Sequence, residues 1–222
     1  MNKLLRDTEG GALLEFTLIF PVLLAVALGT VDFAYLLFDY SMANKAAFQG
    51  ARQAIVINPV ATGITSPGYT AAQMGFLGEA CFDPATGNAS SDNNCPTITT
   101  ACTAASSSGT CTGGYAWNET AFTNPSATNE WQKGIFDRMR NVFPRLQRQN
   151  VQIVYATNGL GFTGRPSGLP MNVTVSIQGM THQFYFIGAL ARITSLRTMP
   201  AFATTLTSEC MDNTTANNPC GV

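Results

Sequence analysis

Residues 11–31 read GALLEFTLIFPVLLAVALGTV, and Glu15 is the one charged residue among them. At 1.5 Å per residue, a helix of this length extends for about 30 Å, which is the thickness of the hydrocarbon core of a bilayer. A membrane-spanning helix therefore accounts for the length and composition of the stretch. A plain anchor does not account for Glu15, because an ionisable residue inside a membrane costs a few kcal/mol and by default indicates a function.

Helical periodicity continues beyond the apolar stretch. Apolar residues recur at the i, i+3, i+4 and i+7 spacing of one helix face, namely Phe33, Leu36, Leu37, Tyr40, Ala47, Phe48, Ala51 and Ile55. Asp32, Asp39 and other polar residues take most of the remaining surface. We expect one helix over residues 11–57, because the proline of Asn58-Pro59 pushes the residue before it out of the α region. Pro21 is the place where this helix can bend, since proline removes one backbone hydrogen bond.

A conventional signal peptide is a second interpretation of the N-terminus. Lys3 and Arg6 supply a basic start, and Ala25-Val26-Ala27 matches the small-x-small cleavage pattern, which predicts a mature chain that begins at Leu28. Acidic residues lie before and within the apolar stretch, where such signals avoid them, and the helical periodicity runs past the cleavage point. Both observations count against this interpretation.

A third interpretation accounts for the lone carboxylate. The stretch Glu9-Gly10-Gly11-Ala12-Leu13-Leu14-Glu15-Phe16 resembles the processing site of type IV pilins, particularly the Tad/Flp branch. The resemblance implies that a prepilin peptidase cuts after Gly10, so that Gly11 becomes the N-terminus and Glu15 the fifth residue, with Phe16 next. In a filament, the Glu15 carboxylate then pairs with the free amine of a neighbour's Gly11, which is far better than burying either charge alone.

Two further motifs extend the resemblance to TadE-like proteins. Residues 15–21, EFTLIFP, resemble the family signature that ends in proline, here Pro21. Residues 46–52, AAFQGAR, resemble the closing segment of that domain and include Gly50, Ala51 and Arg52. Residues 199–209 resemble the tail of these proteins. Together the motifs favour a pilin-like protein over an ordinary anchor.

The rest of the chain predicts a small α+β head. Residues 151–155 and 172–177 alternate like strands and predict an antiparallel pair with a long, Gly- and Pro-rich link. Residues 201–206 are a further candidate strand, and residues 182–187 fit either a strand or a short helix. An apolar stripe over residues 131–142 predicts a helix that starts at a cap on Asn124 or Asn129 and ends at Pro144.

Six cysteines indicate an oxidising compartment. They are Cys81, Cys95, Cys102, Cys111, Cys210 and Cys220. Six cysteines allow fifteen pairings, and the sequence does not choose among them. Residues 86–114 are rich in Ser, Thr, Asn and Gly and predict loops, because such a composition buries little apolar area. Disulfides suit this Cys-containing region, residues 81–115, better than zinc, since the chain has no CxxC and one histidine that is distant from every cysteine.

Other functional classes find little support in the sequence. Residues 159–164 match GxGxxG, but Arg165-Pro166 follows where a dinucleotide fold needs a helix, so we interpret them as a hairpin loop. His182 has no nucleophile motif near it and is interpreted as a strand or surface histidine. The net charge of −1 and the 11% of charged residues argue against nucleic acid, which calls for a basic face.

The sequence therefore predicts a leader over residues 1–10, an apolar and then amphipathic helix over residues 11–57, and an extracytoplasmic head over residues 58–222. The resemblance implies a non-enzymatic TadE-like minor pilin (pseudopilin) without a cofactor, which acts in pilus assembly, initiation or tip formation for surface adhesion. It implies a bacterial inner-membrane protein with its head in the periplasm or outside. The loop between Cys81 and Cys111 is the hypothesised exposed binding surface.

The resemblance also implies the partners. They are a prepilin peptidase, other pilins and minor pilins of the same pilus, the inner-membrane assembly platform, and membrane lipid before assembly. The alternative is a signal-peptide-bearing or membrane-anchored extracytoplasmic binding protein or enzyme unrelated to pili.

Overall fold

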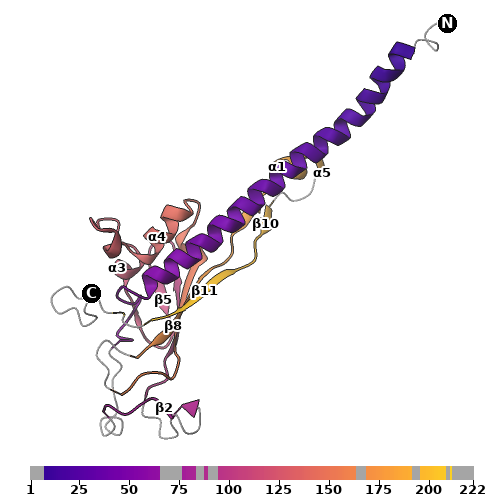
Figure 1. Cartoon of the computed structure of the whole chain (residues 1–222). Helices are drawn as coiled ribbons and strands as arrows, with labels where there is room; N and C mark the ends of the chain where they lie inside the picture. Colours follow the sequence, from indigo (N-terminus) through magenta and orange to yellow (C-terminus); the bar gives the residue numbers. More distant parts are fainter. Residues whose placement is uncertain are drawn as a thin grey trace. The chain divides into compact units, whose positions relative to one another are not determined.

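The computed structural model describes residues 8–65, 77–83, 88–89, 95–163, 169–191, 196–208 and 211. The chain forms two compact units, one of Met1–Ser41 and Met180–Met199 and one of Met42–Gly179 and Pro200–Val222. We describe each unit by itself. Helix α1, Thr8–Ala54, contributes to both of them and is the long indigo to violet helix of Figure 1.

Helix α1 confirms the predicted long N-terminal helix. It continues through Pro21 and ends at Ala54, shortly before the expected end at Ile57. The backbone N–H of Ile55 still donates to the Ala51 carbonyl at 3.2 Å, and the N–H of Val56 already turns to the Gln53 carbonyl. The helix therefore closes with a tighter turn before it reaches Pro59.

The buried face of α1 differs from the predicted one. Its buried members are small residues, one amide and two carboxylates: Asp32, Asp39, Ala43, Ala46, Ala47, Gly50, Ala51, Gln53 and Ala54. Four of the large residues of the predicted stripe, Phe33, Leu37, Tyr40 and Phe48, are exposed instead. The prediction was wrong about the face because alanine and glycine allow other elements to approach the helix backbone closely, which leaves the bulky side chains on the outside.

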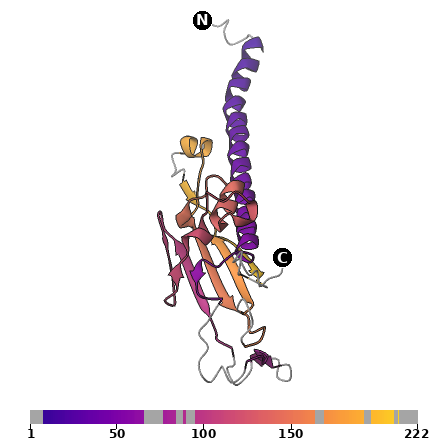
Figure 2. The same cartoon turned by 90° about the vertical axis from the view of Figure 1, so that its left-hand side faces the viewer.

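A five-stranded antiparallel sheet is the centre of the second unit. Its order is β11-β8-β7-β4-β5 (Figure 2), with the bounds Phe202–Thr207, Met171–Ile177, Val151–Thr157, Thr99–Ala104 and Gly109–Cys111. The predicted pair of strands is confirmed, and Val151 of β7 lies opposite Ile177 of β8. The predicted strand over residues 201–206 is confirmed as β11. Val151, Ile153 and Tyr155 are buried and alternate with less buried neighbours, as expected for a sheet with one covered face.

Strands β4 and β5 correct the prediction that residues 86–114 form only loops. They make a hairpin that joins the main sheet beside β7, with Cys102 opposite Cys111. Thr100, Cys102 and Ala104 of β4 are buried and alternate with less buried residues. The composition argument failed because threonine is β-branched and small residues can line the covered face, so the strand needs no large apolar side chains.

The helices of the second unit lie between β6 and β7. In chain order they are α3 (Glu119–Phe122), η1 (Glu130–Gln132), α4 (Ile135–Val142) and η2 (Arg148–Asn150). The predicted helix over residues 131–142 is thus split into η1 and α4, and Gly134 rather than Asn124 or Asn129 is the N-cap of α4. A Cβ atom at Gly134 would lie 2.5 Å from the Phe122 carbonyl oxygen, so this close approach requires glycine. The helix ends before Pro144, as predicted.

Aromatic packing and one ion pair connect these helices to the sheet. The ring of Phe122 lies 4.9 Å from that of Trp117 and 5.4 Å from that of Phe136. The Arg148 guanidinium covers the Phe122 ring and lies 2.6 Å from the Glu119 carboxylate, which lowers the pKa of Glu119. Trp117 is therefore part of the packing of the head, as its sequence context suggested.

Small strand pairs complete the fold. In the second unit β1 (Ala61–Thr62) pairs with β6 (Ala116–Trp117), and β2 (Phe82–Asp83) pairs with β3 (Asn88–Ala89). In the first unit β9 (Thr181–Gln183) pairs with β10 (Leu196–Thr198), and α5 (Phe186–Ala191) lies between them in the chain. Residues 182–187 thus contain both of the elements that the sequence left open.

The tight packing around Gly50 gives a testable expectation for α1. A Cβ atom at Gly50 would lie 2.6 Å from the Met139 Sδ of α4 and 3.2 Å from Val175 of β8. We expect Gly50→Ala to lower the free energy of unfolding of the head by about 1–3 kcal/mol in denaturant titrations of the full chain in detergent, because overpacking forces neighbours to shift. Gly29→Ala is the matched control, since its Cβ would only reach Ile187 at 3.9 Å. That control should be neutral or slightly stabilising through helix propensity, and equal effects of the two variants would contradict the expectation.

Candidate functional site

The N-terminal part of α1 carries an uncovered apolar surface. Leu13, Leu14, Phe16 and Leu18 are 61–70% exposed. The helix over Leu13–Ala54 is long and apolar enough to cross a membrane, and none of its most apolar stretch is buried. Water is a poor environment for such a surface, so this segment is suited to lipid or to the helices of other proteins.

The predicted processing and assembly residues lie together at this end of α1. Gly10, Gly11, Glu15 and Phe16 are all within the helix, and the side chain of Glu15 is exposed. The Phe16 ring lies 5.4 Å from that of Phe20 on the next turn. Pro21 is also exposed. The structure therefore leaves the Glu15 carboxylate accessible to a group from outside the chain.

The closing motif of the predicted domain has a different environment. Gly50 and Ala51 are buried in the second unit, where Gly50 faces α4 and β8. Arg52 is exposed, and its guanidinium lies 5.8 Å from the centre of the Phe48 ring. This motif therefore serves the packing of the head, and the structure does not bring it together with Glu15.

A segment that we call the strap, Met180–Met199, contacts α1 within the first unit. The Nδ1 atom of His182 lies 2.8 Å from the Oδ2 atom of Asp39, and both residues are buried. The pair is distant in sequence, and β9 and β10 hold His182 in a small antiparallel ladder. Strand placement of His182 was predicted, but its placement on the surface was wrong, because the carboxylate on α1 compensates the burial of the ring.

A second carboxylate of α1 caps helix α5. Asp32 accepts hydrogen bonds from the backbone N–H groups of Tyr185, Phe186 and Ile187 at 3.2, 2.9 and 2.8 Å. These are the N–H groups at the start of α5, which have no partner within a helix. Asp32 and Asp39 were assigned to the polar surface from the sequence. Their spacing of seven residues, which places them on one helix face, is the signal that identifies them as a pair.

Four of the six cysteines form disulfides in the structure. Cys81 is bonded to Cys95, and Cys102 to Cys111. Cys210 and Cys220 lie outside the described residues. Among the residues that the structure does describe, no three His, Cys, Asp or Glu side chains are grouped so that they could hold a metal ion. The cysteines of the region over residues 81–115 thus act as cross-links of the head.

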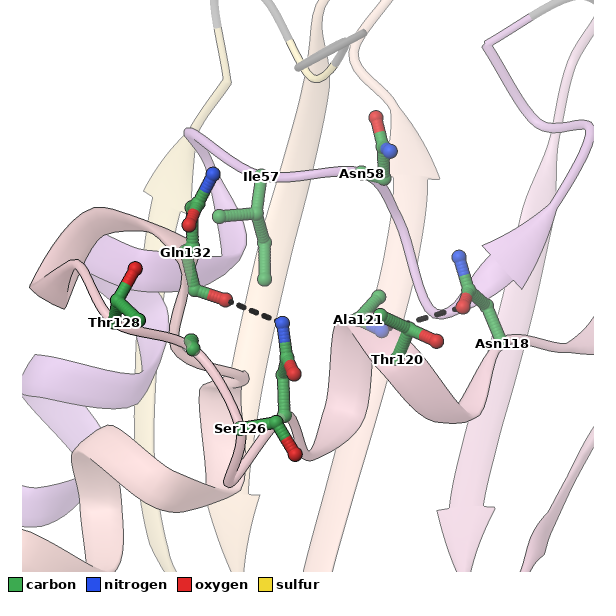
Figure 3. Close-up of a pocket in the computed structure, with 10 residues that line it drawn as sticks. Ile57, Asn58, Asn118, Thr120, Ala121, Ser126, Thr128 and Gln132 are labelled. Atoms are coloured by element: carbon green, nitrogen blue, oxygen red, sulfur yellow. Dashed lines mark hydrogen bonds between the residues drawn. The ribbon is translucent and has the colours of Figure 1, made fainter. Parts of the chain in front are cut away.

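A pocket of about 380 Å³ in the second unit has neutral walls (Figure 3). Its lining consists of amides, hydroxyls and small apolar groups, from Ile57, Asn58, Asn118, Thr120, Ala121, Asn124, Ser126, Ala127, Thr128 and Gln132. Two of its amides are used internally: Asn118 Oδ1 accepts from the Ala121 N–H, and Asn124 Nδ2 donates to the Gln132 carbonyl (Figure 3). A lining of this kind offers no general acid or base.

Comparison with known proteins identifies the N-terminal segment. Residues 10–52 match the family model described as TadE-like protein. No curated protein and no solved structure matches the chain. The match confirms the resemblance on the residues that carried it, from Gly10 to Arg52, and supports a TadE-like protein of the Tad pilus.

Proposed function

We propose that this chain is a minor pilin, or pseudopilin, of a Tad-type pilus and acts in the assembly, initiation or tip formation of the filament for surface adhesion. The observation that carries the proposal is the uncovered apolar surface of α1 within the segment that matches TadE-like proteins. A helix of this kind needs a lipid environment before assembly and protein neighbours after it. A pilin meets both of these environments in turn.

Processing is the first part of the proposal. A prepilin peptidase cuts after Gly10 and leaves Gly11 as the new N-terminus. The exposed Glu15 carboxylate then pairs with the amine of Gly11 on a neighbouring pilin. Support comes from the accessibility of Glu15 and from its place four residues after Gly11 on an otherwise apolar helix. Pairing removes both charges from the apolar surroundings at once.

The middle of α1 supports helix packing in the filament. Phe33, Leu37, Tyr40 and Phe48 are 44–66% exposed, while the buried face of the helix consists mainly of small residues. The large side chains are thus free to contact other pilins of the same pilus. Such contacts are the interactions that the apolar face of an amphipathic helix makes in general.

Localisation and partners follow from the same reading. The protein resides in the bacterial inner membrane as a single-pass protein with its head in the periplasm or outside, and the inner-membrane assembly platform extracts it toward the pilus. Its role is structural rather than enzymatic. The cross-linked region between Cys81 and Cys111 is the surface proposed for adhesion, since loops on a rigid scaffold commonly carry binding specificity.

The mature N-terminus tests this function directly. Mass spectrometry of the protein extracted from membranes should find a chain that starts at Gly11, and the same chain in cells without the prepilin peptidase should keep residues 1–10. A start at Leu28 would establish ordinary signal-peptide cleavage, and an intact Met1 in peptidase-containing cells would establish a plain anchor. Either result would contradict the proposal.

A further inference from the structure

Helix α5 and the apolar part of α1 enclose a groove of about 390 Å³ in the first unit. Pro21, Leu24 and Leu28 of α1 form one wall, and Phe186 and Ile187 of α5 form the other. The lining is almost entirely apolar. Every residue of α5, FIGALA, has an apolar or absent side chain.

The position of the groove along α1 indicates what fills it. Residues 11–31 are the stretch that is long enough to cross a bilayer, and Asp32 is the first charged residue after it. At 1.5 Å per residue, Pro21 and Gly29 lie about 15 Å and about 3 Å from Val31 along the helix. A hydrocarbon core of about 30 Å has leaflets of about 15 Å each. The groove therefore falls at the depth of the leaflet on the side of the head.

The backbone of α5 is prepared for an apolar environment. Unpaired N–H groups are costly in lipid, and a helix of this length leaves the N–H groups at its start without intrahelical partners. The buried Asp32 carboxylate accepts from three of them, at Tyr185, Phe186 and Ile187. The start of α5 thus has its donors satisfied by α1 and does not depend on water.

The side chains at the start of α5 point to a lipid partner rather than to a covered protein core. Tyr185 is 59% exposed and Phe186 is 41% exposed. Aromatic residues of this kind are enriched where a membrane protein meets the interface between lipid and water. Their neighbour Asp32 marks the end of the apolar stretch of α1, so the aromatic pair lies at the expected level of that interface.

We propose that α5 inserts into the head-side leaflet of the membrane and that lipid acyl chains fill the groove between α5 and α1. The strap then gives the protein a second membrane contact beside the spanning helix. This inference rests on the proposed membrane-spanning role of residues 11–31. The occupant to which it commits is lipid, because the wall formed by Pro21, Leu24 and Leu28 is continuous with the surface that faces the bilayer.

Quenching of tryptophan fluorescence by labelled lipid tests the inference. The full chain is reconstituted into vesicles of phosphatidylethanolamine and phosphatidylglycerol that contain phosphatidylcholine with a nitroxide on its acyl chain. The wild type measures the background from Trp117 and Trp131. Phe186→Trp places a probe on α5, and Leu24→Trp, at a position 47% exposed, places one on the spanning part of α1. Leu160→Trp, at a position 50% exposed in the second unit, is the matched control outside the membrane.

We expect the fluorescence added by Phe186→Trp to be quenched as strongly as that added by Leu24→Trp, while that of Leu160→Trp stays unquenched. Tyr185→Trp gives a second probe at an exposed position and should show quenching by nitroxides close to the headgroup. If Leu24→Trp is quenched and both strap probes behave like Leu160→Trp, the insertion of α5 is overturned and the spanning helix is retained. If Leu24→Trp is unquenched, the spanning role and the inference fail together. If Phe186→Trp is shielded from lipid and its emission depends on the protein-to-lipid ratio, a second copy covers the groove, which also overturns the inference.

Discussion

Glu15→Ala is expected to abolish piliation while membrane insertion and cleavage after Gly10 remain largely intact. The carboxylate is exposed on an apolar helix surface, and its proposed partner is the amine of Gly11 on a neighbouring pilin. Without the carboxylate, that amine enters the apolar filament core as an uncompensated charge, and leaving one partner of a buried pair alone costs about 3–5 kcal/mol. The loss is repeated at each contact that the chain makes, so assembly should fail altogether.

The measurement is a count of pili by electron microscopy together with the mass of the membrane-extracted protein. Glu15→Gln separates charge from hydrogen bonding, and we expect it to fail as well, because an amide does not neutralise an ammonium group. Thr17→Ala is the matched control on the same exposed segment, since the Thr17 hydroxyl bonds only to the Leu13 carbonyl of its own helix in the structure. Normal pili in Glu15→Ala cells would remove the amine–carboxylate pairing from the mechanism.

Asp39→Ala is expected to release the strap from α1. The substitution leaves the His182 ring buried without the carboxylate that lies 2.8 Å from its Nδ1 atom. The Nε2 atom of the ring is already buried without a hydrogen-bond partner, so the ring has no other compensation at that nitrogen in the described part of the chain. Breaking a buried pair from one side costs about 3–5 kcal/mol, which is of the order of the stability of a small local structure.

Hydrogen exchange of the full chain in detergent measures this effect. The amides of β9 and β10 should exchange faster by a factor of about 10²–10³ in Asp39→Ala, while the amides of β7 and β8 keep their protection. Asp39→Leu combined with His182→Leu should restore most of the protection, because apolar groups can replace a buried pair at little cost. Lys45→Ala, at an exposed position of the same helix, is the surface control. Unchanged exchange in β9 and β10 would show that the pair does not hold the strap.

Local patterns in the sequence were enough to predict the long helix, the β7–β8 pair and strand β11. Each of these depends on a periodicity of neighbouring residues, such as the alternation from Val151 to Tyr155. The motif at the start of α1 was also visible, because its residues are consecutive. The match of residues 10–52 to TadE-like proteins confirms that part of the interpretation.

The features that the sequence did not predict depend on contacts between distant segments. Asp39 and His182 are 143 residues apart, and nothing in the local pattern around either residue announces the other. The buried face of α1 was misassigned because the large residues suggest one face, whereas the approach of the head selects the small ones. Strand β4 was missed because its stability comes from β7 and from the Cys102–Cys111 cross-link rather than from apolar residues of its own.

The two carboxylates that hold the strap also fix its alignment along α1. Asp32 and Asp39 are seven residues apart, which is close to two helical turns, so both face the strap at once. Adding or removing one residue between them would rotate one carboxylate by about 100° away from the other. The strap can therefore be attached in one register only, and it measures a set length of helix beyond the apolar stretch. In this way the chain encodes the distance between the first charge after its apolar segment and the ladder of β9 and β10.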